Sequence, residues 1–142
     1  MSNPFQSLEI SASALSAERS RVAVIMQNIA NASTLPSAPG QAPYRRQTVV
    51  FETILNESQR RRGDAQSGGV RVKKIEADTS PFPRLHRPGH PAASPQGWVE
   101  SSNVELPMEM VDLMDASRSY EANLTALRMM REMLEQALQI TR

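Results

Sequence analysis

The stretch from Leu106 to Arg142 is the feature that most constrains how this chain folds. It contains no glycine, and its one proline, Pro107, stands where the first turn of a helix tolerates one. Alternating steps of four and three residues pass through ten positions, of which eight are apolar: Leu106, Met110, Leu113, Ser117, Tyr120, Leu124, Leu127, Arg131, Leu134 and Leu138. A helix over this stretch would be roughly 50 Å long, whereas a small domain is only about 30 Å across. We therefore expect the helix to project from the rest of the chain and to need partners for its apolar row.

The N-terminal stretch, residues 5–32, carries a similar seven-residue repeat. One row consists of Leu8, Leu15, Val22 and Ile29. A second row lies three residues earlier and consists of Phe5, Ala12, Arg19 and Met26. Seven of these eight positions are apolar. An ordinary amphipathic helix with a surface rich in alanine and serine explains the pattern equally well. The helix is predicted to end near Asn31, because Asn28 and Asn31 tolerate a left-handed cap and Pro36 prevents continuation.

The middle of the chain lacks a helical pattern. All six glycines and eight of the ten prolines lie between residues 36 and 97. Three segments predict strands: Thr48–Phe51, Val70–Ile75 and Trp98–Val99. We expect a hairpin or a three-stranded sheet docked on the helices, with a polar, mobile loop at residues 56–69. Five prolines between residues 79 and 97 predict that this segment forms neither a regular helix nor a central strand.

The predicted fold is mainly α with a small β middle region. It divides into an N-terminal helical segment at residues 1–35, a Pro/Gly-rich middle at 36–103 and a C-terminal helical segment at 104–142. The two long helices are expected to form a coiled-coil-like layer. With 39% apolar and 4% aromatic residues in 142, the chain can build only a small core.

Charge and cysteine content exclude several classes of function. The formal net charge of +1 gives no reason to expect nucleic acid or an anionic membrane as a partner. The chain has no cysteine, which excludes a disulfide framework and a thiolate metal site. The first twenty residues contain neither a basic start followed by an apolar run nor a segment long enough to span a membrane, so we expect no cleaved signal peptide and no membrane span.

No group of residues has the pattern of a catalytic, metal or cofactor site, and we predict that the chain is not an enzyme. His86 and His90 are four residues apart, but Pro88 and Gly89 between them prevent a shared helix face, and no third ligand is near. The carboxylates of residues 105–121 have no histidine partner, and helix solubility and the helix dipole explain them better than acid–base chemistry. The basic groups are expected to be solvated loop and strand ends: Arg45–Arg46, Arg60–Arg62 and Lys73–Lys74.

The residues favour assembly with other chains. Six of the eight methionines lie in the C-terminal stretch, where flexible thioethers can pack against non-identical neighbours. Arg19 and Arg131 interrupt the apolar rows, so each needs a carboxylate partner or a position at the rim. We predict an assembly interface formed by the following residues: Leu8, Leu15, Val22, Asn28, Ile29, Asn31, Leu113, Tyr120, Leu124, Leu127, Leu134 and Leu138.

An ordered set of short motifs resembles the flagellar basal-body rod proteins, and within them those of the proximal rod. The general rod and hook pattern is Asn28-Ile29-Ala30-Asn31 followed by Thr34. The narrower resemblance rests on motifs that run in order over nearly the whole chain: Tyr44-Arg45-Arg46, Ser80-Pro81-Phe82, Pro88-Gly89-His90-Pro91, Gly97-Trp98-Val99, Asn103-Val104, Glu109-Met110-Val111-Asp112 and Ser117-Arg118-Ser119-Tyr120-Glu121-Ala122-Asn123. The chain departs from the family at Trp98, where tyrosine is frequent, and at Ser102, where proline is common.

The resemblance implies a structural subunit of the bacterial flagellar rod, which crosses the periplasm. Members of the family are exported by the flagellar type III apparatus without cleavage of a signal peptide. Their terminal helices pack around a central channel, beside further copies, the other proximal rod proteins and the basal adaptor subunit. The alternatives are another axial subunit of the rod and hook family, a non-flagellar coiled-coil adaptor, and a nucleic-acid-binding module that would use Arg60–Arg62.

Overall fold

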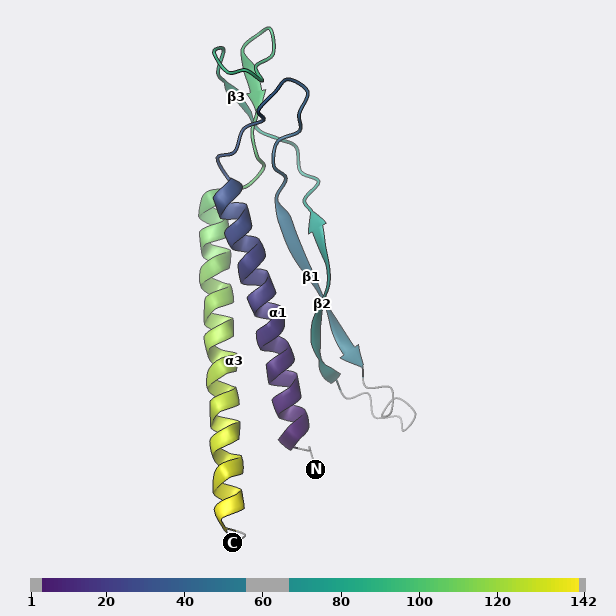
Figure 1. Ribbon diagram of the computed structural model, residues 1–142, viewed down its shortest axis with the longest axis vertical. Coiled ribbons are helices and arrows are strands. Elements are labelled where there is room, and N and C mark those ends of the chain that lie inside the picture. Colours follow the sequence, from purple (N-terminus) through teal and green to yellow (C-terminus); the bar gives the residue numbers. More distant parts are fainter. Residues whose placement is uncertain (1–3, 56–66, 141–142) are drawn as a thin grey trace.

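The computed structural model of the chain describes residues 4–55 and 67–140, and it has long helices at both ends with strands between them (Figure 1). This arrangement confirms the predicted fold class. Two of the strands form a hairpin along the helices, and the other two lie in a small lobe at one end of the molecule, which we call the tip lobe (residues 79–100). The elements in chain order are α1 (Pro4–Asn31), β1 (Gln47–Leu55), β2 (Ser67–Ala77), β3 (Arg84–His86), β4 (Trp98–Glu100) and α3 (Leu106–Ile140).

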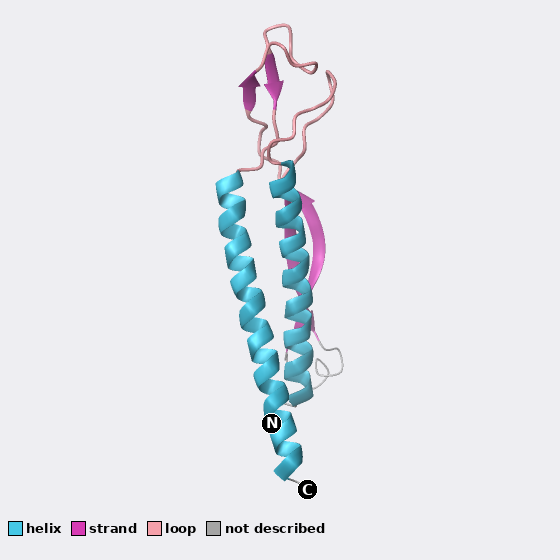
Figure 2. Ribbon diagram, turned by 60° about the vertical axis from the view of Figure 1, so that its left-hand side comes forward, coloured by secondary structure: helices cyan, strands magenta, loops and turns pink. Residues whose placement is uncertain are grey.

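The two helices run antiparallel and side by side along most of their length (Figure 2). The end of α1 and the start of α3 lie together near the tip lobe, and α3 extends past the start of α1 at the opposite end. With 35 residues against 28, α3 has the length that its glycine-free apolar repeat predicted.

Helix α1 ends at Asn31, but the predicted left-handed cap is wrong. Among the described residues, a positive φ occurs only at glycines. The Asn31 side chain instead donates a hydrogen bond back to the Gln27 carbonyl at 2.8 Å. The chain then leaves the helix through turns, in which the amide of Ala32 donates to Ile29 and that of Thr34 donates to Asn31. Asn28, the other predicted cap residue, is buried inside the fold.

Strands β1 and β2 form an antiparallel hairpin that lies along α1 (Figure 1). Both strands were predicted, but the predicted loop at 56–69 is wrong for residues 67–69, which begin β2; its other residues, 56–66, lie outside the described part. Gly69 adopts a φ of +130° and approaches α1 so closely that a side chain there would collide with the Ser13 hydroxyl. That hydroxyl also accepts a hydrogen bond from the Val70 amide at 3.1 Å, which fixes the hairpin to the helix.

Strands β3 and β4 form a second two-stranded sheet, so the alternative of one three-stranded sheet is wrong. Leu85 pairs with Val99. Each strand of this sheet is an edge strand, which is why a strand can form within the proline-rich segment. At the turn before β4, Gly97 has a φ of +80° and lies so close to Pro88 and His86 that any side chain would clash. The His86 ring packs edge-on against Trp98 at 5.0 Å.

The core is small, as the composition predicted. The buried apolar side chains of the described residues are Ala17, Val24, Ile25, Val99, Val104 and Ala116. The face that α1 buries runs through Ala17, Val24 and Asn28, whereas the predicted row from Leu8 to Ile29 is only half-buried. Its companion row is exposed at Ala12, Arg19 and Met26. Because these apolar residues are few, buried polar side chains make up the rest of the interior.

Candidate functional site

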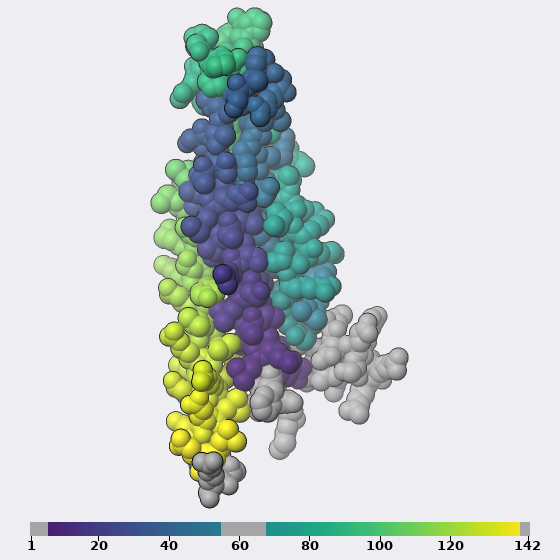
Figure 3. Space-filling view, viewed as in Figure 1, coloured from purple at the N-terminus to yellow at the C-terminus, as the bar shows by residue number. Residues whose placement is uncertain are grey.

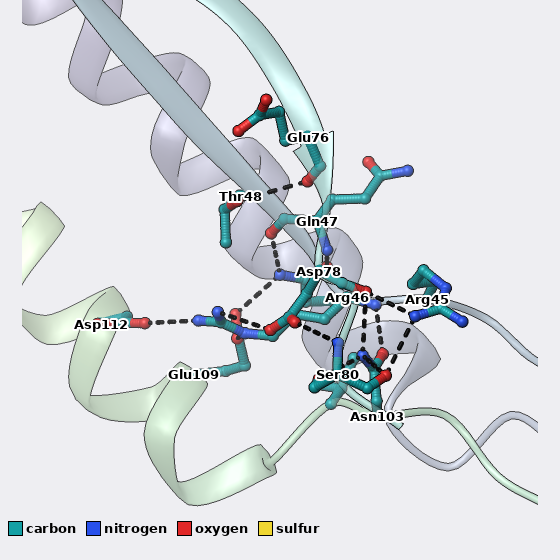
Figure 4. Close-up of polar contacts among 12 residues, drawn as sticks. Arg45, Arg46, Gln47, Thr48, Glu76, Asp78, Ser80, Asn103, Glu109 and Asp112 are labelled. Carbon is teal, nitrogen blue, oxygen red and sulfur yellow. Dashed lines mark hydrogen bonds and ion pairs between the residues drawn. The ribbon is translucent and has the colours of Figure 1, made fainter. Parts of the chain in front are cut away.

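A cluster of buried polar side chains joins the two helices to the strand region (Figure 4). Asn28, in the last turns of α1, is only 1% exposed. Its amide nitrogen donates to the Gln47 carbonyl at 2.8 Å and to Glu109 Oε2 of α3 at 3.0 Å. Its amide oxygen accepts from the Gln47 amide and from the Tyr44 hydroxyl, both at 3.0 Å. One side chain thus binds α1 to the start of β1 and to α3.

Glu109 is fully buried, and Arg46 neutralises its charge. Arg46 Nε donates to Glu109 Oε1 at 2.6 Å, and another nitrogen of the same guanidinium lies 3.1 Å from Asp112. The third nitrogen is 3.7 Å from Asp78, just after β2. Each Glu109 oxygen has a partner, so the carboxylate is buried with its hydrogen bonds satisfied.

A second layer of hydrogen bonds holds the segment that precedes α3. The Arg46 amide donates to Asn103 Oδ1 at 2.7 Å, and Asn103 Nδ2 donates to the Ser80 hydroxyl at 2.9 Å. Arg45 donates to the carbonyls of Asp78 and Ser80, and its guanidinium lies 4.1 Å above the Phe82 ring. These contacts fix the base of the tip lobe against the top of the helix pair.

The pKa values of three side chains in the cluster are shifted in directions that favour the observed contacts. Burial, followed by the charge of Glu109, raises the pKa of Tyr44. Burial alone would lower the pKa of Arg46, but the hydrogen bond to Glu109 and the charges of Glu109, Asp112 and Asp78 outweigh burial and raise it. The backbone and hydroxyl of Ser80 lower the pKa of Asp78. The cluster is therefore built to keep an arginine charged and a tyrosine neutral.

The surface of the helix pair carries an unusual number of exposed apolar side chains. Each of the following α3 side chains is 43–69% exposed: Leu106, Met108, Met110, Val111, Met114, Met129, Met133 and Leu138. On α1, Met26 is 58% exposed. Such a run of large apolar side chains along one long helix is typical of surfaces that contact other protein chains.

Comparison with known proteins assigns the chain to a family. The model "Flagella basal body rod protein" matches residues 8–35, and the model "Flagellar basal body rod FlgEFG protein C-terminal" matches residues 96–140. The flagellar basal-body rod protein FlgC of Bacillus subtilis is 41% identical over 96% of this chain and 97% of its own length. The chain belongs to the FlgC family of flagellar basal-body rod proteins. Its members from Borreliella burgdorferi and Salmonella typhimurium are 39% and 36% identical, covering 96% and 92% of both chains.

Membership of the FlgC family confirms the resemblance and gives the chain a structural role in the rod of the flagellar basal body, with other rod proteins as assembly partners. The two family models match the helical ends of the chain and leave residues 36–95 unmatched. The polar cluster draws on five of the motifs that carried the resemblance, namely those beginning at Asn28, Tyr44, Ser80, Asn103 and Glu109.

Several sequence interpretations of this region are wrong. Arg46 is not a solvated strand end, since its side chain is 25% exposed and contacts three carboxylates. Glu109 does not serve helix solubility, because it is buried. One feature of the sequence could have indicated the cluster. Asn28 is a poor helix former inside an apolar stretch, and such a residue usually has a specific hydrogen-bonding role.

The predicted interface residues lie at different depths within the FlgC-family fold. Asn28 is buried and Leu138 is exposed. The remaining ten are half-buried: Leu8, Leu15, Val22, Ile29, Asn31, Leu113, Tyr120, Leu124, Leu127 and Leu134. Val22 and Tyr120 line a shallow groove between the two helices, with Arg19 exposed beside them. Arg131 is also exposed, at the rim, with Glu135 at 3.0 Å. The role of the predicted interface residues in assembly stays a prediction.

Other candidate chemistry can be placed in the structure. His90 Nδ1 accepts a hydrogen bond from the Ala92 amide, and His86 packs on Trp98, so the two histidines have separate roles in the tip lobe. In the described part of the chain, no group of three or more acidic or histidine side chains is arranged to hold a metal ion. No helix within residues 4–55 or 67–140 is long and apolar enough to cross a membrane.

Proposed function

We propose that this chain is a subunit of the proximal rod that assembles through its two terminal helices and transmits torque along the rod across the periplasm. The observation that carries the proposal is the run of exposed apolar side chains along α3, from Met108 to Leu138. Burial of one such side chain is worth about 1.5–3 kcal/mol. Several buried together in each subunit would outweigh the marginal stability of an isolated chain.

The polar cluster gives the proposal its mechanical part. A helix pair alone would leave the hairpin and the tip lobe free to swing, because the apolar core is small. The contacts of Arg46 with Glu109, Asp112 and Asp78 make the strand region move with the helices. In this proposal, residues 1–35 and 104–142 form the inner assembly layer, and residues 36–103 make outer or axial contacts that resist torque.

Membership of the family supports assembly with other rod proteins, and the specific partners are part of this proposal. Further copies of the chain, the other proximal rod proteins and the basal adaptor subunit cover the exposed helix faces. The chain reaches the rod through the flagellar type III export apparatus, without a cleaved signal peptide. These assignments rest on the resemblance, and the exposed methionines support them because flexible thioethers adapt to non-identical neighbours.

The test places a charge on the exposed face of α3. Met110 and Met114 are one helical turn apart and are 55% and 54% exposed, so Met110→Asp and Met114→Asp should leave the isolated fold intact. A strain that lacks the native gene is complemented with each variant. We expect normal export of the variant, with swimming in soft agar reduced by at least about tenfold, since burying an unpaired carboxylate costs several kcal/mol.

The matched control is Thr125→Asp on the same helix. Thr125 is exposed and lies seven residues after Arg118 and seven before Glu132, so its face of the helix already carries exposed charges. This variant should swim normally. Swimming at the native rate by both methionine variants would contradict assembly through this face, and loss of export would move the defect to secretion.

A further inference from the structure

One groove on the molecule has the size of a ligand-binding site. It lies between the loop at residues 36–42 and the tip lobe, which adjoin at one end of the molecule (Figure 3), and its volume is about 800 Å³. Pockets that bind small molecules have volumes of about 300–1,000 Å³. The lining shares no residue with the polar cluster or with the exposed apolar run on α3. The proposed role in assembly therefore leaves this groove unexplained.

Trp98 gives the groove one large aromatic surface. It is the only tryptophan of the chain, it is 47% exposed, and the His86 ring packed against it holds the indole in place. Its ring nitrogen donates no hydrogen bond within the described part of the chain. None of the described residues that line the groove is a leucine, isoleucine, methionine or phenylalanine, and Val99 is only 1% exposed. The exposed apolar surface of the groove is therefore one flat ring, with only prolines and alanines beside it.

Planar polar side chains surround this ring. Gln41 and Gln96 are exposed at the groove. The Gln41 side-chain oxygen accepts a hydrogen bond from the Ser37 amide at 3.1 Å, so its side-chain nitrogen is left to donate. Arg84 and Glu100, paired on neighbouring strands at 3.6 Å, are also part of the wall. Because their charges cancel, the groove is complementary to a neutral ligand rather than to an ion.

Turns on both sides of the groove fix its shape. In one wall the Gly97 amide donates to the Ser94 carbonyl, and the Ser94 amide donates to the Trp98 carbonyl, both at 2.8 Å. In the other wall the Gln41 amide donates to the Ala38 carbonyl at 3.2 Å. A site that is already formed loses little conformational entropy when a ligand binds. The groove therefore needs no folded partner to shape it.

We propose that this groove binds a neutral oligosaccharide whose sugar rings carry their substituents equatorially. Such a ring has a flat face of C–H groups and a rim of hydroxyl groups. The flat face stacks on Trp98, and burial of its C–H groups favours binding. The hydroxyl groups, which both donate and accept, bind the side chains of Gln41 and Gln96 and the pair of Arg84 and Glu100.

A segment of another protein chain fits the groove less well. The centres of protein interfaces are depleted of charged residues and depend on several large apolar or aromatic side chains that fill pockets. The groove has one such side chain, Trp98, beside a charged pair and two amides. A saccharide matches this balance, because every sugar ring joins an apolar face to a polar rim.

The proposed function indicates where the saccharide would come from. A rod that crosses the periplasm passes the glycan strands of the cell wall, which are built from N-acetylated sugar rings of this equatorial kind. This source rests on the proposed function, whereas the saccharide site itself rests on the groove alone.

The single tryptophan permits a direct test in the purified, full-length chain. Chitotetraose, a chain of N-acetylglucosamine, is titrated into the protein while the fluorescence of Trp98 is recorded. We expect a saturable shift of the emission to shorter wavelength, because a sugar ring displaces water from the indole, with a Kd of about 1 mM or lower. Maltotetraose, whose linkages curve the chain and misalign its flat faces, should bind at least about tenfold more weakly. Equal binding of the two would overturn the proposal.

Two related sugars identify the ligand more closely. Cellotetraose has the linkage of chitotetraose but lacks its acetamido groups. Weaker binding of cellotetraose would support the cell wall as the source, and equal or tighter binding would rule out that source and keep the saccharide site. The deacetylated, cationic form of chitotetraose should bind more weakly than the neutral form, because the paired charges of the groove leave no anion for it. Tighter binding of the cation, or no binding of any of these sugars, would contradict a site for a neutral saccharide.

Variants followed by calorimetry show which side chains make the contact. Trp98→Ala should abolish binding of chitotetraose. Gln96→Ala should weaken binding about threefold, since this exposed side chain contributes one hydrogen bond. Gln136→Ala, at an exposed position of α3 outside the groove, is the matched control and should bind like the native chain. Equal affinities of the two glutamine variants would show that the groove does not hold the sugar.

Another copy of the chain is the competing occupant. If the emission of Trp98 shifted with protein concentration in the absence of saccharide, a second copy would fill the groove and the proposal would be wrong. The titration needs no rod assembly. Failure of the swimming test at Met110 and Met114 would therefore remove the lateral interface and leave the binding result unaffected.

Discussion

Glu109 is the residue on which the buried cluster depends. A carboxylate with no exposed surface is costly unless its charge is paired and both oxygens have hydrogen bonds. Arg46 at 2.6 Å and Asn28 at 3.0 Å meet both conditions. Removing the charge therefore affects α1, the start of β1 and α3 together, because the partners come from all three.

Glu109→Gln should lower the free energy of unfolding by roughly 2–3 kcal/mol. This is less than the 3–5 kcal/mol expected for a fully isolated buried pair, because Asp112 and Asp78 still contact Arg46. Denaturation in urea, followed by circular dichroism, measures the change. The control Glu105→Gln, at an exposed position just before α3, should cost less than about 1 kcal/mol. Equal costs for the two variants would show that the cluster does not stabilise the fold.

Tyr44 gives the cluster a measurable response to alkali. Its pKa is raised above the ordinary value of about 10 by burial and by Glu109, so the fold favours the neutral phenol. The stability that this provides is fully present below pH 10 and is lost as the pH rises through the folded pKa. In a Tyr120→Phe background, ultraviolet absorbance should show Tyr44 ionising at a higher pH in the native protein than in urea. Identical midpoints would contradict this environment for Tyr44.

Contacts of this kind between individual side chains could not be predicted from the sequence. Asn28 and Glu109 are 81 positions apart, and nothing in their spacing indicates that they meet. Both residues belong to motifs that resemble the family, but the sequence pattern predicts that the charged side chains near them are solvated. Whether a charge is buried depends on the packing of several segments at once, which a single sequence does not fix.

At the level of elements, the hairpin is held to α1 by a close backbone approach. Gly69 has no side chain to separate β2 from Ser13, and the Ser13 hydroxyl accepts a hydrogen bond from Val70 while donating to Ile10. These contacts lie at the end of the hairpin away from the polar cluster. The hairpin is thus fixed at both ends.

Gly69→Ala should loosen the hairpin without unfolding the helices. The new methyl group would collide with Ser13, and alanine is strained at a φ of +130°, at a cost of about 1–3 kcal/mol. Limited digestion by trypsin at Arg71, Lys73 and Lys74, all exposed on β2, should become roughly tenfold faster. Gly89→Ala is the control, because nothing lies within 4 Å of a side chain there and its φ is unstrained. An unchanged rate for Gly69→Ala would mean that the approach to Ser13 does not hold the hairpin.

The helices were easier to predict than the sheets. A sustained apolar repeat without glycine is a strong local signal, and α3 begins and ends close to the predicted positions. The strands at Thr48, Val70 and Trp98 were also found. The pairing of the strands was not predicted. Strand β3 has the sequence Arg84-Leu85-His86, which carries no strand pattern. Its pairing with β4 depends on the turn at Gly97, which brings the two strands together.

For the whole molecule, the structure combines a well-fixed end with a sparsely covered one. The cluster, the tip lobe and the start of α3 are joined by many contacts. At the other end, α3 extends past the start of α1, and Met133 is 62% exposed. Short helical segments are marginal in water, so we expect the order of these turns to depend on neighbouring chains.

Amide hydrogen exchange should therefore depend on protein concentration at one end of α3 only. In dilute solution, residues 129–140 should exchange much faster than residues 109–116, which the cluster holds in place. Raising the concentration should slow exchange in the first group, because association buries Met133 and its neighbours, and leave the second group unchanged. Met133→Asp should abolish the concentration dependence, since a carboxylate opposes that burial. Full protection of both groups in a dilute monomer would mean that a single chain stabilises its own terminal helix, and assembly would then not be needed to order it.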